Sequence, residues 1–218
     1  SSGWTAISVN APAVTYGTNA QVKVSVKNGS GTPTGSVSLR LDQGAPRVGT
    51  LNSAGQVTFD LGSLTPGVHA ISATFTGTGQ DPAPALTGTL TVNRRPLKVI
   101  GGRIYDGTNV VATKDLSIAN LVAGDSLTIQ GQVTLTGAGA GQQLVSSFAG
   151  LTLGGTSASN YTLLGAAGSI RIRPAPLMLT LFGTRSYDGT NLASADILKI
   201  RQSNVIFGDD LKLMGNVT

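Results

Sequence analysis

An internal repeat is the feature that most constrains the fold of this chain. The segment Tyr105-Asp106-Gly107-Thr108-Asn109 recurs as Tyr187-Asp188-Gly189-Thr190-Asn191, 82 residues further on (105 to 187). A Gly-Asp pair follows each copy, at Gly124-Asp125 and at Gly208-Asp209. Repetition of this length is typical of serial domains, each folded around its own core, rather than of one large globule.

Alternating apolar residues predict strands throughout residues 1–93. The chain has 30 glycines among 218 residues and only 11% charged residues, a composition that favours strands joined by turns. Four short runs place an apolar residue at every second position: Val22, Val24, Val26; Val37, Leu39, Leu41; Val57, Phe59, Leu61; Ile71, Ala73, Phe75. Such runs, separated by turns at roughly ten-residue spacing, predict a β-sandwich. The sequence shows no convincing amphipathic helix of useful length, although residues 112–121 could hold a short one.

Two proline-bearing junctions mark the expected domain boundaries. Arg94-Arg95-Pro96 and Arg173-Pro174-Ala175-Pro176 favour stiff, extended connectors, because proline fixes φ and lacks an N–H group. We therefore expect a sandwich domain at 1–93, a complete repeat at 94–174, and the truncated first half of a second repeat at 175–218. The predicted fold class is all-β, with tandem β-sandwich and Gly-rich β-repeat domains arranged as an elongated array.

The half repeat raises a specific problem of strand pairing. Its strands lack the second half of the repeat, so apolar faces and strand edges would lie open. We expect either that the structural domain is offset from the sequence repeat or that 175–218 pairs with strands of another molecule.

The inventory of reactive side chains argues against catalysis. All ten acidic residues are Asp, the chain has no Cys, and its single histidine is His69. Thiol nucleophiles, disulfides and Cys/His zinc sites are thereby excluded. A Ser or Thr hydrolase would need His69 as its base, and no nucleophile-elbow spacing accompanies it. We expect no enzyme activity and no cofactor, and a half-exposed packing role for His69.

Residues 14–92 resemble the bacterial Ig-like repeats of large surface proteins. The motifs that carry this resemblance are Val14-Thr15-Tyr16-Gly17, Thr32-Pro33-Thr34-Gly35-Ser36-Val37, Gly55-Gln56-Val57 and Pro66-Gly67-Val68-His69-Ala70-Ile71-Ser72-Ala73-Thr74-Phe75. The resemblance implies an Ig-like sandwich in an exported bacterial protein.

Residues 95–174, and the half copy after them, resemble the Tyr-Asp-Gly (YDG) repeats of filamentous haemagglutinin-like exoproteins. The two Tyr-Asp-Gly-Thr segments carry this resemblance, together with the Gly-Asp pairs and Ser159-Asn160-Tyr161-Thr162-Leu163. It implies an adhesin at the bacterial cell surface or secreted, in which such repeats act as stalk and spacer beside further repeats of the same polypeptide. It assigns no catalytic residues.

The Tyr-Asp-Gly segments are explained without a ligand. In each, Asp can accept bonds from nearby backbone N–H groups, Gly can adopt positive φ, and the Tyr ring can pack below. We interpret Tyr105, Asp106, Gly107 and Tyr187, Asp188, Gly189 as a structural motif; the alternative is a surface tyrosine that stacks on sugar. Calcium is a further alternative, with Asp209 and Asp210 as the best oxygen ligands, although the chain has no dense Asp-x-Asp-x-Asp-Gly loop.

The charge balance leaves two interpretations open. The net charge is +5, and its fifteen cationic residues are spread along the chain, which favours a solvated, mildly basic surface with no nucleic-acid partner. The alternative is an adhesive module that binds host or matrix glycans or another polyanion through Arg94, Arg95, Arg171 and Arg173, with Tyr161 nearby. No uninterrupted apolar stretch is long enough for a transmembrane segment.

Overall fold

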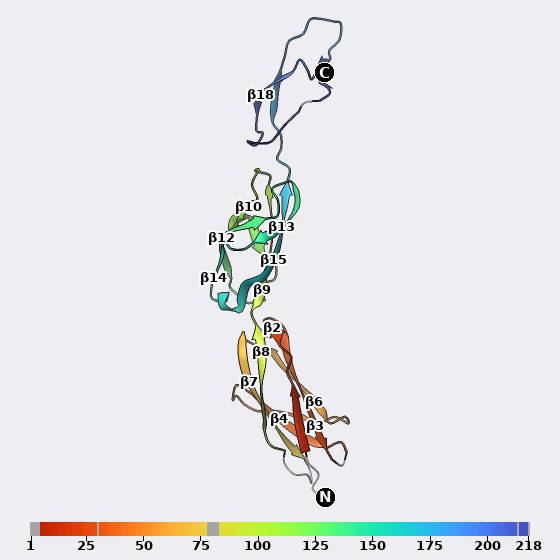
Figure 1. Cartoon of the computed structure of the whole chain (residues 1–218), viewed down its shortest axis with the longest axis vertical. Coiled ribbons are helices and arrows are strands. Elements are labelled where there is room, and N and C mark those ends of the chain that lie inside the picture. Colours follow the sequence, from red (N-terminus) through yellow and green to blue (C-terminus); the bar gives the residue numbers. More distant parts are fainter. Residues whose placement is uncertain (1–4, 30, 78–82, 213, 218) are drawn as a thin grey trace. The chain divides into compact units, whose positions relative to one another are not determined.

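The computed structural model describes residues 5–29, 31–77, 83–212 and 214–217. These residues form strands, with two single 3-10 turns, η1 (Thr113–Asp115) and η2 (Ala158–Asn160), as their helical elements (Figure 1). The strands are β1 (Thr5–Asn10), β2 (Val14–Thr15), β3 (Asn19–Asn28), β4 (Gly35–Leu41), β5 (Arg47–Thr50), β6 (Gln56–Ser63), β7 (Gly67–Gly77), β8 (Leu86–Asn93), β9 (Arg95–Ile104), β10 (Val110–Ala112), β11 (Leu116–Ile118), β12 (Thr128–Leu135), β13 (Gly141–Ser147), β14 (Leu151–Gly154), β15 (Tyr161–Arg173), β16 (Leu179–Phe182), β17 (Ala193–Ser194), β18 (Lys199–Ser203) and β19 (Asn216–Val217). The predicted all-β class is confirmed. The described residues contain no helix with the length and apolarity that a bilayer crossing requires.

Within 112–121, where a short helix could form, the structure has one single 3-10 turn. That segment holds only the turn η1, between β10 and β11. None of the three side chains of η1 is buried, so packing gives a longer helix no support. Leu116 and Ile118 instead extend along β11, which pairs with β9.

The chain divides into two compact units that interleave in sequence. The first comprises Ser1–Leu97, Leu121–Thr128 and Gly154–Gly165, and the second comprises the segments between and after them, Lys98–Asn120, Ile129–Leu153 and Ala166–Thr218. The segment 94–174 therefore contributes to both units. The predicted boundaries at the proline junctions stay a prediction.

The first unit contains a two-sheet sandwich. One sheet has the order β1-β3-β6 and the other β2-β8-β7-β4-β5. Along β3, Val22, Val24 and Val26 are buried while Lys23 is exposed, because successive side chains point to opposite faces of a strand. The inward faces of both sheets meet in one core: Ala20, Val22, Val24, Val26, Val37, Leu39, Leu51, Phe59, Leu61, Ile71, Ala73, Phe75, Ala83 and Leu90. Each fully buried aliphatic side chain stabilises the fold by about 1.5–3 kcal/mol relative to its exposed state.

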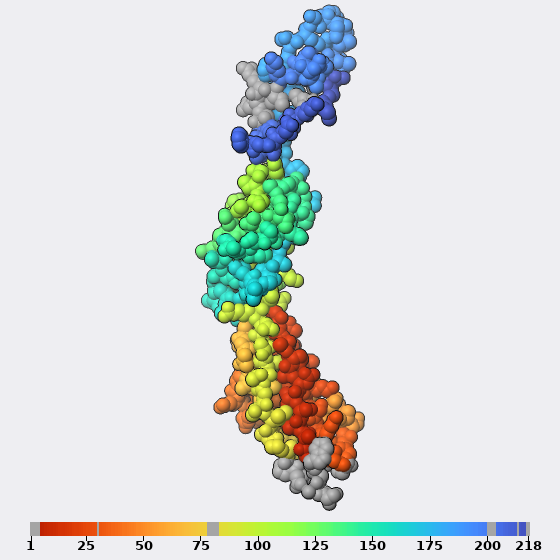
Figure 2. Space-filling model, viewed as in Figure 1, coloured from red at the N-terminus to blue at the C-terminus, as the bar shows by residue number. Residues whose placement is uncertain are grey.

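One strand pair in the first unit is parallel. β2 pairs with β8, with Val14 opposite Val92 and Thr15 opposite Asn93. The space-filling view shows the red N-terminal strands packed directly against the yellow β8 segment (Figure 2). This pairing holds the residues that follow β2 beside the end of β8.

The second unit is built around the sheet β10-β12-β13-β15-β9-β11, with β14 paired to β12. Its most buried apolar residues come from strands far apart in sequence: Val99, Val111, Val133, Leu135, Leu151, Ile170 and Ile172. In the C-terminal segment, β16 pairs with β18 and β17 with β19. These pairings repeat β9 with β11 and β10 with β12 in the complete repeat. Apolar side chains are exposed there, including Met178 and Phe207, and strand pairing of 175–218 with another molecule stays a prediction.

Candidate functional site

Two tyrosines converge on one carboxylate in the first unit. The Tyr16 hydroxyl donates to Asp125 Oδ1 at 2.9 Å, and the Tyr161 hydroxyl donates to Asp125 Oδ2 at 2.6 Å. We call these three residues the tyrosine–aspartate cluster. All three belong to the first compact unit, although Tyr16 and Asp125 are 109 residues apart in sequence.

Backbone bonds at the end of β8 position Tyr16. The Tyr16 N–H donates to Asn93 O at 2.9 Å, and the Arg95 guanidinium donates to Tyr16 O at 3.1 Å. Gly17 follows with φ of +84°, a conformation that glycine adopts without strain. A Cβ atom on Gly17 would lie 2.6 Å from Val122 Cγ2, so this glycine also allows Val122 to approach the backbone.

A tight turn positions Asp125. The Asp125 N–H donates to Val122 O at 3.0 Å, and Gly124 has φ of +88°. The Val122 N–H donates to the Tyr161 hydroxyl at 2.8 Å, so this hydroxyl both accepts a bond from the turn and donates one to Asp125. The turn and Tyr161 therefore fix each other.

Ring packing adds to the hydrogen bonds. The Tyr16 and Tyr161 rings meet edge to face, with centroids 5.9 Å apart and planes at 77°. A pair of this geometry stabilises by about 0.5–1.5 kcal/mol beyond its area burial. Tyr161 is only 1% exposed, whereas Tyr16 and Asp125 are half-buried.

The cluster holds its carboxylate ionised and its phenols neutral. Hydrogen bonds from Tyr161, and then from Tyr16 and Ser157, lower the pKa of Asp125 below its ordinary 3.8, although burial opposes this. Burial, followed by the bond to Asp125, raises the pKa of Tyr161 from 10.0 to about 12 and also raises that of Tyr16. The contribution of Asp125 to stability is present above pH 3.8 and is lost as the pH falls through the lowered pKa. The contribution of Tyr161 is present below pH 10 and is lost as the pH rises towards 12.

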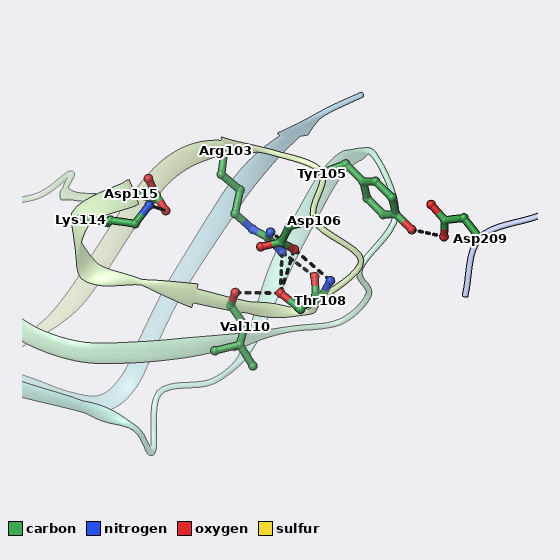
Figure 3. Close-up of polar contacts among 8 residues, drawn as sticks. All are labelled: Arg103, Tyr105, Asp106, Thr108, Val110, Lys114, Asp115 and Asp209. Atoms are coloured by element: carbon green, nitrogen blue, oxygen red, sulfur yellow. Dashed lines mark hydrogen bonds and ion pairs between the residues drawn. The ribbon is translucent and has the colours of Figure 1, made fainter. Parts of the chain in front are cut away.

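The first Tyr-Asp-Gly segment forms a compact polar turn in the second unit (Figure 3). Asp106 Oδ1 accepts from the Thr108 N–H at 2.9 Å and from its hydroxyl at 2.8 Å, and Gly107 has φ of +79°. The buried Arg103 forms an ion pair with Asp106 and donates to Thr108 O. Burial of Asp106 opposes its ionisation, but the bonds from Arg103 and Thr108 outweigh it and lower the pKa of Asp106 to about 2.

The second segment forms the same turn with a different environment for its tyrosine. Asp188 Oδ1 accepts from the N–H and the hydroxyl of Thr190 at 2.9 and 2.8 Å, and Gly189 has φ of +80°. The expectation that each tyrosine ring packs below its own turn is wrong for Tyr187, which is 92% exposed. The bonds of this turn run from Arg185 and Thr190 to Asp188, Ser186 O and Thr190 O, and the Tyr187 ring takes part in none of them.

The Asp209-Asp210 pair is contacted by Tyr105. The Tyr105 hydroxyl donates to Asp209 Oδ1 at 2.6 Å, and Figure 3 shows the Tyr105 ring pointing away from its own turn towards Asp209. This bond raises the pKa of Tyr105. The described residues hold no group of three or more His, Cys, Asp or Glu side chains that could bind a metal ion, and calcium at Asp209 and Asp210 stays a prediction.

Two family models match the chain. Residues 7–93 match the bacterial Ig-like domain (group 3), and residues 87–169 match the YDG domain. Residues 7–93 are thus similar to an Ig-like domain, and residues 87–169 are similar to a YDG domain. Within the tyrosine–aspartate cluster, Tyr16 comes from the Ig-like match, whereas Asp125 and Tyr161 come from the YDG match. No curated protein sequence matches the chain.

Several solved structures show distant similarity. The CARDB domain of the PF1109 protein from Pyrococcus furiosus, in complex with di-metal ions, is 20% identical, with 42% of this chain and 94% of that chain covered and a TM-score of 0.32. The fibronectin(III)-like modules of Clostridium thermocellum CbhA are 12% identical, with 78% and 95% covered and a TM-score of 0.31. A 1.5-MDa bacterial ice-binding adhesin is 11% identical, with 80% and 68% covered and a TM-score of 0.33.

The four arginines proposed for polyanion contact lie in both units. Arg94 is exposed in the first unit, where Arg95 is half-buried and bonded to Tyr16 O. Arg171 and Arg173 are exposed on β15 in the second unit. Tyr161, expected as a neighbour of these arginines, is buried, and its hydroxyl bonds within the cluster. Polyanion contact through the arginines stays a prediction.

His69 takes part in a separate contact of the first unit. Its Nδ1 faces Asp42 Oδ2 at 2.6 Å, its Nε2 faces Thr65 O at 2.8 Å, and its side chain is 12% exposed. Both partners are acceptors, so both bonds form only when the ring carries two protons. The bond to Asp42, and then the bond to Thr65, raises the pKa of His69 above its ordinary 6.5.

Raising the pH from about 5.5 to about 9 is expected to lower the thermal melting temperature of the chain. The stabilisation by protonated His69 is complete below pH 6.5 and is lost as the pH rises through its raised pKa. Differential scanning calorimetry across this range measures the change, with His69→Gln as the comparison, because glutamine does not titrate. A wild-type melting temperature that follows the same pH dependence as this variant would contradict the assignment.

Proposed function

We propose that this chain is a non-enzymatic structural spacer segment of a large bacterial surface or secreted adhesin. The observation that carries the proposal is the tyrosine–aspartate cluster: both oxygens of Asp125 are taken by tyrosines of the same chain. A carboxylate used in this way supports the attachment of one domain to the next rather than binding of a ligand. The filamentous haemagglutinin-like context belongs to the same proposal.

The surroundings of His69 support a non-enzymatic role. Its two ring nitrogens are engaged by Asp42 and Thr65, and the resulting rise in its pKa favours the protonated ring, which cannot act as a general base. The matches to a bacterial Ig-like domain and a YDG domain support placement at the cell surface or outside the cell. A spacer works by holding the two ends of the chain far apart. It can do so because each domain buries its own strand faces and short connectors limit bending.

Small-angle X-ray scattering of the intact chain tests the spacer function. A compact globule of 218 residues has a radius of gyration of about 17 Å. We expect a value at least about 1.5 times larger, because a spacer keeps its domains in series. A value close to that of the compact globule would overturn the proposal.

Heparin binding separates the spacer from a polyanion-binding module. The spacer role predicts no retention of the intact chain on heparin at about 150 mM salt, where exposed charges are screened. Retention that disappears in the triple variant Arg94→Ala, Arg171→Ala, Arg173→Ala would favour the binding module instead. Arg95 is left unchanged because its guanidinium holds Tyr16 O, so its loss would also disturb the cluster.

A further inference from the structure

The Tyr105–Asp209 contact repeats the geometry of the Tyr16–Asp125 contact. In both, a tyrosine hydroxyl donates to Oδ1 of the aspartate in a Gly-Asp pair, at 2.9 Å in the first unit and 2.6 Å in the second. We call the set Tyr16, Gly17, Val122 and Asp125 the first joint. The corresponding set Tyr105, Gly107, Ile206 and Asp209 is the second joint.

The tyrosine sides of the two joints are attached to their domains in the same way. The Tyr16 N–H donates to Asn93 O, the last residue of β8, at 2.9 Å. The Tyr105 N–H donates to Arg173 O, the last residue of β15, at 2.8 Å. Each tyrosine is thus fixed to the end of the strand that leads into a proline-bearing connector.

The aspartate sides of the two joints are the same turn. Asp125 N–H donates to Val122 O, and Asp209 N–H donates to Ile206 O, both at 3.0 Å. The glycines before them, Gly124 and Gly208, have φ of +88° and +95°. Each turn therefore has a β-branched residue three positions before its aspartate.

On the tyrosine side of each joint, a glycine leaves space for this β-branched residue to approach the backbone. A Cβ on Gly17 would lie 2.6 Å from Val122 Cγ2, and a Cβ on Gly107 would lie 2.7 Å from Ile206 Cγ2. Both glycines have positive φ, +84° and +79°. Each joint combines one hydrogen bond with one close contact that only glycine permits.

We propose that the Tyr-Asp-Gly segment of each YDG domain is a docking site for a four-residue turn in the repeat that follows. In order, the residues of this turn are a β-branched residue, any residue, Gly and Asp. Tyr187–Gly189 is then an open site of the same kind. Tyr187 is 92% exposed, and a Cβ on Gly189 would meet no atom of the described residues within 4 Å. Its partner is the Gly-Asp turn of a further YDG repeat. The inference deepens the spacer function proposed above and rests on it.

Paired glycine variants of the intact chain test the docking contact. Gly107 and Gly189 share the sequence Tyr-Asp-Gly-Thr and nearly the same φ, so alanine strains both backbones equally, but only Gly107 faces Ile206. Nitration of each of the four tyrosines, followed by mass spectrometry, measures their accessibility. We expect Gly107→Ala to raise the nitration rate of Tyr105 about fivefold and Gly189→Ala to leave the rates of Tyr105 and Tyr187 unchanged. Equal effects of the two variants on Tyr105 would overturn the proposal.

An aspartate pair tests the hydrogen bond independently. Asp209→Ala is expected to raise the nitration of Tyr105 by a similar factor, since it removes the acceptor of the Tyr105 hydroxyl. Asp210→Ala, at the neighbouring exposed position, is the matched control and leaves the rate unchanged. An unchanged rate in Asp209→Ala would contradict the second joint.

A longer chain tests the open site. Joining a second copy of 135–218 after Thr218 continues the repeat in register, because Thr218 aligns with Thr134, and supplies another Ile-Phe-Gly-Asp turn. We expect Tyr187 to become protected from nitration to the level of Tyr105, while Gly189→Ala in the longer chain restores its reactivity. Tyr187 that stays as reactive as in the 218-residue chain would overturn the proposal. That result would rule out docking at Tyr187–Gly189 but would not bear on the spacer function. The scattering measurement tests the spacer function separately, so the two failures are distinguishable.

Discussion

The Tyr161→Ala variant is expected to lose about 3–5 kcal/mol of unfolding free energy, the largest effect of any single change considered for this chain. The Tyr161 side chain is 1% exposed, so its removal leaves a cavity. It also removes a donor to Asp125 and an acceptor for the Val122 N–H. Urea denaturation followed by circular dichroism measures the loss, and hydrogen exchange is expected to place it in the first unit.

Two further tyrosine variants separate the energetic effect of the cavity from that of the lost hydrogen bonds. Tyr161→Phe keeps the ring and is expected to cost about 1–3 kcal/mol, the cost of leaving the partners of one hydroxyl unsatisfied. Tyr187→Ala, at a ring that is 92% exposed, is expected to stay within about 0.5 kcal/mol of wild type. A loss in Tyr187→Ala as large as that in Tyr161→Ala would refute the structural role assigned to the buried ring.

The Asp125→Ala variant is expected to lower the unfolding free energy by about 2–3 kcal/mol, the second largest effect. The carboxylate accepts from two phenol hydroxyls, and one of them belongs to a buried side chain. Charge-assisted bonds are stronger than neutral ones, although the half-exposed position of Asp125 reduces the gain. Asp210→Ala is the control, and chemical denaturation of both variants gives the comparison.

Combining Asp125→Ala with Tyr161→Phe tests whether the two residues act together. Residues that share a hydrogen bond are coupled, so the double variant is expected to lose less than the sum of the two single losses. Full additivity would show that Asp125 and Tyr161 stabilise the first unit separately, against the geometry of the cluster.

The strands of the sandwich could be predicted from sequence because their signal is local. Residues two positions apart share one face of a strand, so Val22, Val24 and Val26 reveal their burial without knowledge of any partner strand. The hydrogen bonds of the Tyr-Asp-Gly turn are equally local, since Asp106 accepts from Thr108 only two positions away. Such features depend on chain geometry over a few residues.

The tyrosine–aspartate cluster could not be predicted in this way. Tyr16 and Asp125 are brought together by the pairing of β2 with β8 and by the path of the chain through β9, neither of which leaves a periodic trace. The sequence did hold a usable signal in the recurring Gly-Asp pair, which turn chemistry alone does not explain. The direction of each tyrosine ring depends on which turn it meets, so Tyr105 and Tyr187 differ despite identical neighbours.

The parallel pairing of β2 with β8 has a mechanical consequence for the sandwich of the first unit. These strands lie near the two ends of the domain and run in the same direction, so tension on the chain pulls them in opposite senses along their length. The load then acts across all their hydrogen bonds at once, in shear, whereas strands peeled apart at one end would release their bonds singly. Extraction of β8 also requires rupture of the bond from Tyr16 N–H to Asn93 O at its end. Resistance to pulling is thus concentrated where the sandwich continues into β9.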